Sequence, residues 1–316
     1  MAVREEYYFD SSDDNKTRIH AAKWTPDDNN IRGVLQIVHG MQEYILRYDE
    51  FASFMADNGF LVTGHDHIGH GKSVSNEKEL GIMRSKDPAS VMVEDIYTNY
   101  SLIKKQYSDK PYFILGHSMG SYLLRRLLCE KANELSGLKG AIIMGTGTEK
   151  DSTIKMGKNI VSLLARIHGW DYKSKFVAGL MFGKPYKQFD TSGQHPENSW
   201  LSKNVENVKA YYNNPLDNYM FSLNGYRVLL DLTLFDNQPE NISRMNKDLP
   251  ILFASGAMDP VGNLGEGVKE AAEKFKNAGI KDVTLRLYEN DRHEILNETD
   301  REKVRAEILD WIQARI

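Results

Sequence analysis

The chain has 316 residues, of which 41% are hydrophobic, and it carries a formal net charge of −4 with a pI of about 6.2. Its lysines and arginines are scattered, which excludes the clustered basic surface of a nucleic-acid-binding protein. The single cysteine, Cys129, excludes an internal disulfide framework, and its place in a helical pattern predicts a buried apolar role.

The sequence shows neither the pattern of a signal peptide nor that of a membrane-spanning segment. Residues 1–7 lack the apolar core of a signal peptide, and no run approaches the ~18 apolar residues of a membrane span. We therefore expect a soluble cytoplasmic protein, with an exported protein whose signal has been removed as the alternative.

Strand and helix patterns alternate along the first half of the chain. A polar hairpin is predicted first, at residues 4–10 and 17–24. Near-continuous apolar strands then alternate with helices, at strands 33–38, 60–65, 111–116 and 138–145 and helices 47–58, 88–107 and 119–132. This alternation predicts a parallel sheet with helices on both faces.

Residues 148–246 interrupt the alternation with a helical insertion. Its predicted helices lie at 154–168, 176–182, 204–212 and 221–235. The alternation then resumes, at strands 249–256 and 283–288 and helices 267–278 and 298–314. The last helix should bury Val304, Ile308, Leu309 and Ile312. We therefore predict an α/β core with a mostly parallel eight-stranded sheet, formed by residues 1–147 and 247–316.

The most informative motif is Gly-x-Ser-x-Gly at residues 116–120, between a predicted strand and a predicted helix. In this context the serine occupies a strained turn, the nucleophile elbow, which presents its hydroxyl at a helix N-terminus. Glycines beside it allow the backbone to bend that sharply. The context favours Ser118 as a nucleophile over a serine in an ordinary turn.

A serine nucleophile needs a general base, and a carboxylate usually orients that base. After a nucleophile elbow the two follow in the order Asp or Glu, then His, in loops after later strands. Asp259 and His293 each come just after a predicted core strand, so we predict the triad Ser118, Asp259 and His293. The rival acids do not directly follow a core strand; they are Asp231, Asp236 and Asp248.

An acyl-transfer site also needs N–H groups that bind the oxyanion. One comes from the residue after the nucleophile, Met119, and we assign the other to Met41 in the loop after strand 33–38. Residues predicted to support the site without transferring protons are His39, Gly40, Glu43 and His117.

Three motifs together resemble the serine hydrolase group of monoacylglycerol lipases and bacterial lysophospholipases, within the α/β-hydrolase superfamily. The first is His-Gly-Met-Gln-Glu at 39–43, and the second is Gly-His-Asp-His-Ile-Gly-His-Gly-Lys-Ser at 64–73. The third is Gly-His-Ser-Met-Gly at 116–120 with Gly-Ala-Met-Asp-Pro at 256–260 and Arg-His-Glu at 292–294. The resemblance covers residues 5–145 and 249–316 and weakens between them. Ser121 departs from the group, which usually has another glycine there.

This resemblance implies an α/β-hydrolase fold in which residues 148–246 form a cap over the C-terminal ends of the strands. It also implies hydrolysis of a lipid monoester, a monoacylglycerol or a lysophospholipid, through an acyl-enzyme and without a metal or organic cofactor. A small-ester or cinnamoyl-type carboxylesterase is the alternative. A weakly hydrolytic ligand-binding relative and an aminopeptidase are less favoured, because the loop lacks the His-Gly-Gly-Pro-Gly of proline iminopeptidase relatives.

Histidines are frequent at residues 65–70, but they flank an aspartate in a glycine-rich turn that the family uses structurally. We therefore expect no metal site there. The expected partner is a small ester with an acyl chain. Transient contact of the cap with a membrane surface, and the oligomeric state, stay open at this stage.

Overall fold

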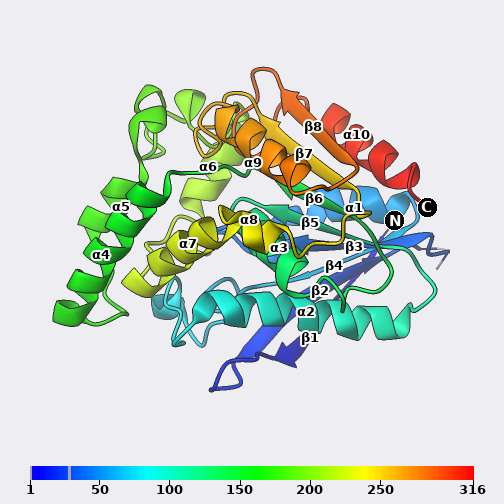
Figure 1. Cartoon of the computed structure of the whole chain (residues 1–316), viewed down its shortest axis with the longest axis horizontal. Helices are drawn as coiled ribbons and strands as arrows, with labels where there is room; N and C mark the ends of the chain where they lie inside the picture. The colour runs from blue at the N-terminus through cyan, green and yellow to red at the C-terminus, as the bar shows by residue number, and fades with distance from the viewer. Residues whose placement is uncertain (1, 28–29) are drawn as a thin grey trace.

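The sheet runs through the whole protein. The computed structural model describes residues 2–27 and 30–316, and within them eight strands form one sheet in the order β1-β2-β4-β3-β5-β6-β7-β8 (Figure 1). The strands are β1 Val3–Asp10, β2 Arg18–Thr25, β3 Gly33–Val38, β4 Phe60–His65, β5 Tyr112–His117, β6 Leu138–Met144, β7 Ile251–Gly256 and β8 Val283–Tyr288. Strand β2 pairs antiparallel with β1 and β4, and the remaining pairs are parallel. The predicted mostly parallel, eight-stranded sheet is confirmed.

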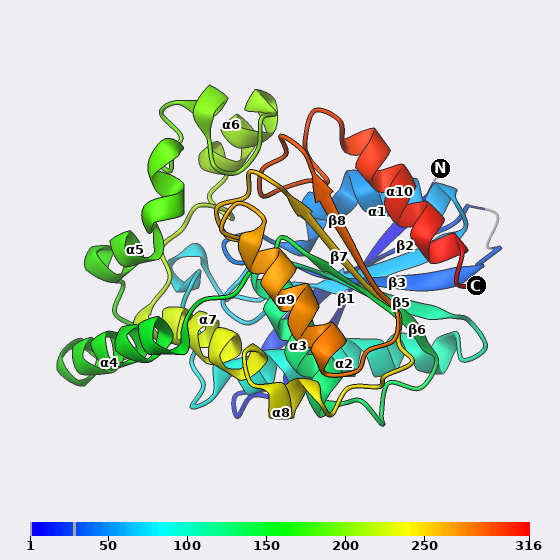
Figure 2. The same ribbon diagram turned by 45° about the horizontal axis from the view of Figure 1, so that its top comes forward.

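Helices cover both faces of the sheet, and this is why the central strands β3, β4, β5 and β7 are buried along their whole length. One face carries α1 Asp49–Asp57 and α10 Arg301–Gln313, and the other carries α2 Pro88–Gln106, α3 Met119–Glu130 and α9 Glu266–Asn277 (Figure 2). Each face has its own apolar cluster. Cys129 lies in the cluster under α3, and its predicted burial is confirmed.

The last helix buries Val304, Ile308, Leu309 and Ile312, as predicted, but it begins at Arg301 and not at Glu298. The carboxylate of Glu298 is instead fully buried. It accepts hydrogen bonds from the N–H groups of Lys203 and Arg292, each at 2.9 Å, so a long-range contact replaces the first helical turn.

Between β6 and β7 the chain forms α4 Asp151–His168, α5 Lys175–Met181, α6 Val205–Asn213, α7 Leu223–Asp236 and the short α8 Pro239–Ile242. Short 3-10 helices lie at Ile45–Tyr48, Glu77–Glu79, Lys184–Gln188 and Pro196–Asn198. Helix α7 contacts both α4 and the core helix α3, so α4 and α5 lie farthest from the sheet, beyond α7 (Figure 1). Helix α8 was not predicted from the sequence.

Candidate active site

Ser118 lies at the turn between β5 and α3. Its φ of 52° and ψ of −122° are unusual for a non-glycine residue, and such a conformation costs roughly 1–3 kcal/mol that the surrounding structure must offset. The turn is possible because a glycine follows at position 120. A Cβ added to Gly120 would lie 2.0 Å from the carbonyl oxygen of Val38, so the elbow packs directly on the backbone of β3.

Ser121 directly follows the Gly-x-Ser-x-Gly motif, in the first turn of α3. Its side chain is fully buried, and its hydroxyl donates a hydrogen bond of 2.6 Å to the carbonyl oxygen of Ser118. The backbone N–H of Ser121 donates to the same oxygen at 2.8 Å. The serine at this position therefore ties the first turn of α3 to the residue at its N-terminus.

Asp259 and His293 come together although 34 residues separate them (293 − 259). Asp259 follows β7 and His293 follows β8, and the side-chain distance from Nδ1 of His293 to Oδ2 of Asp259 is 2.9 Å. The carboxylate of Asp259 is fully buried and also accepts the N–H of Val261 at 2.9 Å. This hydrogen bond to Nδ1 leaves Nε2 as the free nitrogen of the His293 ring.

The three rival acids are paired elsewhere. Asp231 lies 2.5 Å from Nζ of Lys158, and Asp248 lies 2.6 Å from Nζ of Lys281. Asp236 is buried beside the guanidinium of Arg125, with 3.3 Å between Oδ2 and Nε. None of these acids is placed against His293 among the described residues.

The loop after β3 lies against the elbow. A Cβ added to Gly40 would stand 2.8 Å from Cβ of Ser118, so this backbone passes directly beside the serine. Met41 follows, and its N–H donates no hydrogen bond within residues 2–27 and 30–316. Met119 begins α3 on the other side of the serine and is buried. The two predicted oxyanion residues thus lie on the two segments that flank Ser118.

His39 fixes the start of this loop. Its Nδ1 lies 2.8 Å from the carbonyl oxygen of Gly40, and its Nε2 accepts the N–H of His67 at 3.0 Å. The two contacts assign the proton of a neutral imidazole to Nδ1. Burial lowers the pKa of His39, which agrees with the neutral form.

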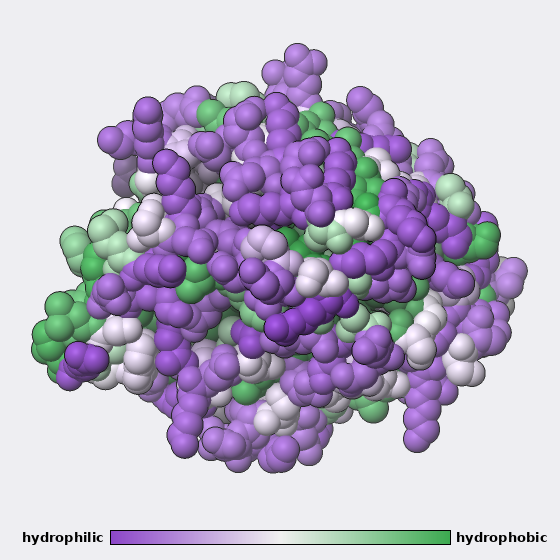
Figure 3. Space-filling model, viewed as in Figure 1, coloured by the Kyte–Doolittle hydropathy of each residue, from purple (hydrophilic) through white to green (hydrophobic). Residues whose placement is uncertain are grey.

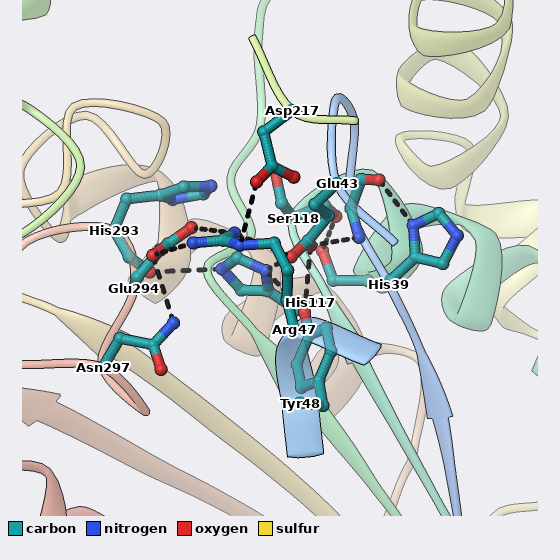
Figure 4. Close-up of polar contacts among 12 residues, drawn as sticks. His39, Glu43, Arg47, Tyr48, His117, Ser118, Asp217, His293, Glu294 and Asn297 are labelled. Carbon is teal, nitrogen blue, oxygen red and sulfur yellow. Dashed lines mark hydrogen bonds and ion pairs between the residues drawn. The ribbon is translucent and has the colours of Figure 1, made fainter. Parts of the chain in front are cut away.

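Glu43 and His117 form a second support behind the serine. The carboxylate of Glu43 accepts the N–H of Gly40, accepts the hydroxyl of Tyr48 at 2.9 Å and lies 3.0 Å from Nδ1 of His117 (Figure 4). Burial disfavours the charged forms of Glu43 and His117. The attraction and the hydrogen bond between the two groups outweigh this effect of burial. The pKa of Glu43 is held below its usual range, and the pKa of His117 is raised.

His117 also connects the elbow to the loop of His293. The centroids of the two imidazole rings are 4.7 Å apart, and Nε2 of His117 lies 3.3 Å from the carbonyl oxygen of His293. Through this contact, the residue before the serine reaches the loop that carries the predicted base.

Sequence reasoning missed Arg47 and Trp200. The guanidinium of Arg47 binds Glu294 with two contacts of 2.6 and 3.0 Å, beside His293. The indole of Trp200 lies over the ring of His293, with the centroids 5.1 Å apart. The spacing of Glu43 and Arg47, four residues apart, was a usable signal for an ion pair, whereas nothing local marks Trp200.

Comparisons with known proteins identify the family of this chain. A profile of the family described as serine aminopeptidase, S33, matches residues 29–300. The chain belongs to this family. It is a serine hydrolase of the α/β-hydrolase superfamily.

Similar proteins include two lipases, found by sequence, and one esterase whose structure has been solved. This hydrolase is 27% identical to monoglyceride lipase of Mus musculus, with 93% of this chain and 86% of the relative covered. It is 25% identical to monoacylglycerol lipase of Mycolicibacterium smegmatis, with 93% and 92% covered. A thermostable carboxyl esterase from Bacillus coagulans, solved in complex with glycerol, has a TM-score of 0.88 at 26% identity, with 100% and 99% covered.

The histidines of the 65–70 loop pack against one another in this hydrolase. His65, His67 and His70 are buried, and burial lowers the pKa of each, to about 3 for His65 and His70. Within the described part of the chain, no group of three His, Cys, Asp or Glu residues is arranged to hold a metal ion. Nor does that part contain a helix both long enough and apolar enough to span a membrane.

Proposed function

We propose that this hydrolase cleaves carboxylic esters through an acyl-enzyme, with Ser118, His293 and Asp259 as its catalytic triad. The observation that carries the proposal is the buried 2.9 Å contact between Asp259 and His293, beside a serine in a strained elbow. A carboxylate in this position keeps the imidazole in the tautomer that accepts a proton at Nε2.

In the proposed mechanism, His293 takes the proton of Ser118 as its Oγ attacks the ester carbonyl. The N–H groups of Met41 and Met119 bind the oxyanion that develops, and the unpaired N–H of Met41 supports this role. His293 then protonates the leaving alcohol, and Asp259 stabilises the imidazolium. Water, activated by His293, releases the acid in the second half of the reaction.

The proposed substrate class is a lipid monoester, either a monoacylglycerol or a lysophospholipid. Similarity over most of the chain to proteins named monoglyceride lipase and monoacylglycerol lipase supports it. We further propose that residues 148–246 act as a cap that binds the acyl chain. The side chains of Phe182, Tyr186 and Trp200 support this role, because they form a series of ring contacts that ends at His293.

We also propose that the cap contacts a lipid surface transiently while it collects substrate. Helices α4 and α5 carry the most exposed of the large apolar side chains in the cap, each of them more than half exposed: Met156, Leu163, Ile167, Phe176 and Leu180. This α4–α5 apolar face forms the hydrophobic area at the left of Figure 3. Basic residues surround it, since residues 154–189 contain seven lysines or arginines and one acid, Asp171. Exposed apolar residues beside basic ones are typical of segments that lie in a membrane interface.

Two other functions remain candidates for specific reasons. Similarity to a protein described as a carboxyl esterase keeps a small-ester carboxylesterase as the second candidate. The description of the family favours an aminopeptidase. An aminopeptidase needs free carboxylates for the substrate amine, and Asp231 and Asp236 of the acidic segment instead lie beside Lys158 and Arg125. A ligand-binding relative with little turnover is less favoured, because Ser118, Asp259 and His293 are all present in the arrangement that the proposed triad needs.

The deciding experiment measures initial rates on butanoyl, octanoyl and hexadecanoyl 4-nitrophenyl esters, on monooleoylglycerol and on amino-acid amides. Wild type is compared with Ser118→Ala and Asp259→Asn. We expect rates on the longer esters and the glyceride, lost by several orders of magnitude in Ser118→Ala and by about 10⁴ in Asp259→Asn. A serine-dependent rate confined to butanoate would favour the small-ester esterase. Full activity in Ser118→Ala would refute the mechanism.

A further inference from the structure

One buried guanidinium joins three separate segments of the protein. Arg47 binds Glu294 of the His293 loop at 2.6 and 3.0 Å, and it lies 3.2 Å from Glu43 of the loop after β3 (Figure 4). Its Nε also lies 3.6 Å from Oδ2 of Asp217, which belongs to the segment between β6 and β7. Side-chain exposure of these four residues is at most 9%.

Two more residues of that segment hold the same guanidinium. Asn207, in α6, accepts a hydrogen bond from Arg47 at 3.4 Å and donates one to Glu294 at 2.7 Å. The ring of Tyr211, one turn further along α6, lies 5.1 Å from Cζ of Arg47. Arg47 is therefore fixed on its core side by two carboxylates and on its cap side by α6 and Asp217.

The carboxylates on the core side reach both predicted parts of the catalytic machinery. Glu43 accepts the N–H of Gly40, next to the proposed oxyanion donor Met41. Glu294 directly follows His293, and its N–H donates to the carbonyl oxygen of Leu201 at 2.9 Å. A shift of the guanidinium would therefore displace the oxyanion loop and the His293 loop together.

The charges explain why these contacts depend on one another. A buried cation is stable only when carboxylates compensate it, and a buried carboxylate without its cation is strongly destabilised. Burial opposes the charge of Arg47, but the neighbouring carboxylates, above all Glu294, raise its pKa. Burial raises the pKa of Asp217 to about 8, so this cap carboxyl is protonated at neutral pH and two charged carboxylates remain around the guanidinium.

We propose that Arg47 is a positioning residue that couples closure of the cap to the alignment of the oxyanion loop and the His293 loop. This inference rests on the proposed ester hydrolysis and names how that site is regulated. Binding of an acyl chain under the cap stabilises the closed position of α6 and Asp217. Through Arg47, the same event favours the aligned positions of Glu43 and Glu294. A short acyl chain that does not reach the cap gains nothing from this coupling.

The coupling is measured by the selectivity between a long and a short ester, taken as kcat/KM on 4-nitrophenyl octanoate divided by kcat/KM on the butanoate. The cap-side variant Asn207→Ala/Asp217→Ala removes two of the three cap contacts of Arg47, together with the hydrogen bond from Asn207 to Glu294, and keeps the ion pairs of Arg47 with Glu43 and Glu294. We expect its selectivity to fall about tenfold, within the usual range of coupling between two sites, with most of the loss in kcat on octanoate. Its rate on butanoate should fall much less.

The core-side variant Arg47→Gln removes the cation itself, so we expect both rates to fall and the selectivity to fall as well. Arg47→Lys keeps the charge without the forked geometry, and it should recover part of the butanoate rate but little selectivity. Asp95→Asn serves as the control for loss of a buried polar contact, because Asp95 is buried and binds Ser11 at 2.6 Å in the N-terminal hairpin. Its selectivity should equal that of wild type.

A pH series provides a second readout. Around Asp217, the facing groups are Arg47, Glu43, Glu294, Asn214 and the hydroxyls of Tyr211 and Tyr219. The carboxyl has a pKa of about 8 in the closed cap and an ordinary value near 3.8 when the cap opens to water. Opening therefore releases a proton, and selectivity should decrease as the pH rises towards 8 and stay level above it. In Asp217→Asn the selectivity should not change with pH.

The outcomes separate this inference from the proposed function. Absence of any serine-dependent rate in wild type would remove the proposed function and the coupling together. If wild type is active but the cap-side variant keeps its selectivity within twofold, the coupling is refuted and ester hydrolysis stands. Equal losses on both esters in the cap-side variant would also refute the coupling, and they would mean that Arg47 only stabilises the core.

Discussion

The indole of Trp200 lies over the imidazole of His293, with 5.1 Å between ring centroids and 32° between ring planes. Trp200 comes from the segment between β6 and β7, and the imidazole beneath it is only 3% exposed. The proposed general base is therefore covered by a residue of the proposed cap, and the indole is part of what shields it from water.

This cover predicts the effect of shortening Trp200. In Trp200→Ala, His293 becomes accessible to water and loses a neighbour that fixes its ring, so kcat/KM on octanoyl ester should fall about ten- to a hundredfold. Trp200→Phe retains an aromatic ring and should keep most of the rate. Trp170→Ala is the matched control, because Trp170 is another tryptophan of the same segment and stacks on Arg227. Equal rates for the Ala and Phe variants at position 200 would contradict this role.

Ser121 predicts a separation of stability from activity at the elbow. Replacing it with glycine removes the 2.6 Å hydrogen bond to Ser118 and places a glycine in a helix. We expect Ser121→Gly to lower the free energy of unfolding by about 1–2 kcal/mol. Activity should stay close to wild type, since the backbone N–H still binds the same carbonyl oxygen. Denaturant unfolding and rates on butanoyl ester, with Ser121→Ala as the intermediate variant, test this; a large loss of rate with unchanged stability would refute it.

The parts of this protein that could be predicted from sequence are those specified by local patterns. Continuous apolar runs marked the buried strands, and Gly-x-Ser-x-Gly marked the turn at Ser118, because both depend on neighbouring residues. That Asp259 and His293 lie close together could be predicted because each follows a strand end, and parallel strand ends meet at one edge of a sheet. Their 2.9 Å contact agrees with that expectation.

The contacts that no local pattern encodes were missed. Arg47 lies 247 positions before Glu294 and 170 before Asp217, so nothing in its own segment indicates that both carboxylates converge on it. The late start of α10 has the same origin, since Glu298 is held by Lys203 and Arg292. Such contacts depend on how the cap packs on the core, and they include the residues proposed here to join the two.

The buried histidines predict a loss of stability in acid. His65 is nearly fully buried, and neither ring nitrogen has a hydrogen-bond partner in the described part of the chain. Burial, together with the nearby His39, lowers the pKa of His65 from 6.5 to about 3. Below pH 6.5 the unfolded chain therefore binds a proton that the folded protein does not. The stability that neutral His65 contributes is fully present above pH 6.5. It is lost as the pH falls towards 3, by roughly 1.4 kcal/mol of unfolding free energy per pH unit.

His65→Leu tests this directly, because leucine fills a similar space without a polar group. We expect unfolding at pH 7 to require about 1 kcal/mol more than in wild type, since an unpaired buried group has been removed. Between pH 6 and 4 the variant should lose stability less steeply. His195→Gln, at an exposed position, is the control and should follow wild type. An unchanged acid slope in His65→Leu would show that His65 does not contribute to acid unfolding.

The α4–α5 apolar face predicts a difference between soluble and membrane-bound substrates. Ile167 and Phe176 are 67% and 61% exposed, so Ile167→Glu and Phe176→Glu should leave folding stability and the rate on butanoyl ester unchanged. Insertion of each side chain into a bilayer interface is worth about 1.5–3 kcal/mol, and a glutamate there is also repelled by anionic headgroups. We therefore expect hydrolysis of monooleoylglycerol in phosphatidylcholine vesicles to fall by about tenfold or more, and further when phosphatidylserine is added.

Leu102→Glu, at an exposed apolar position on α2, is the matched control and should hydrolyse vesicle-bound substrate like wild type. Equal losses in Leu102→Glu would mean that any exposed apolar residue has this effect, and no loss in the α4–α5 variants would mean that the cap does not meet the membrane through this face.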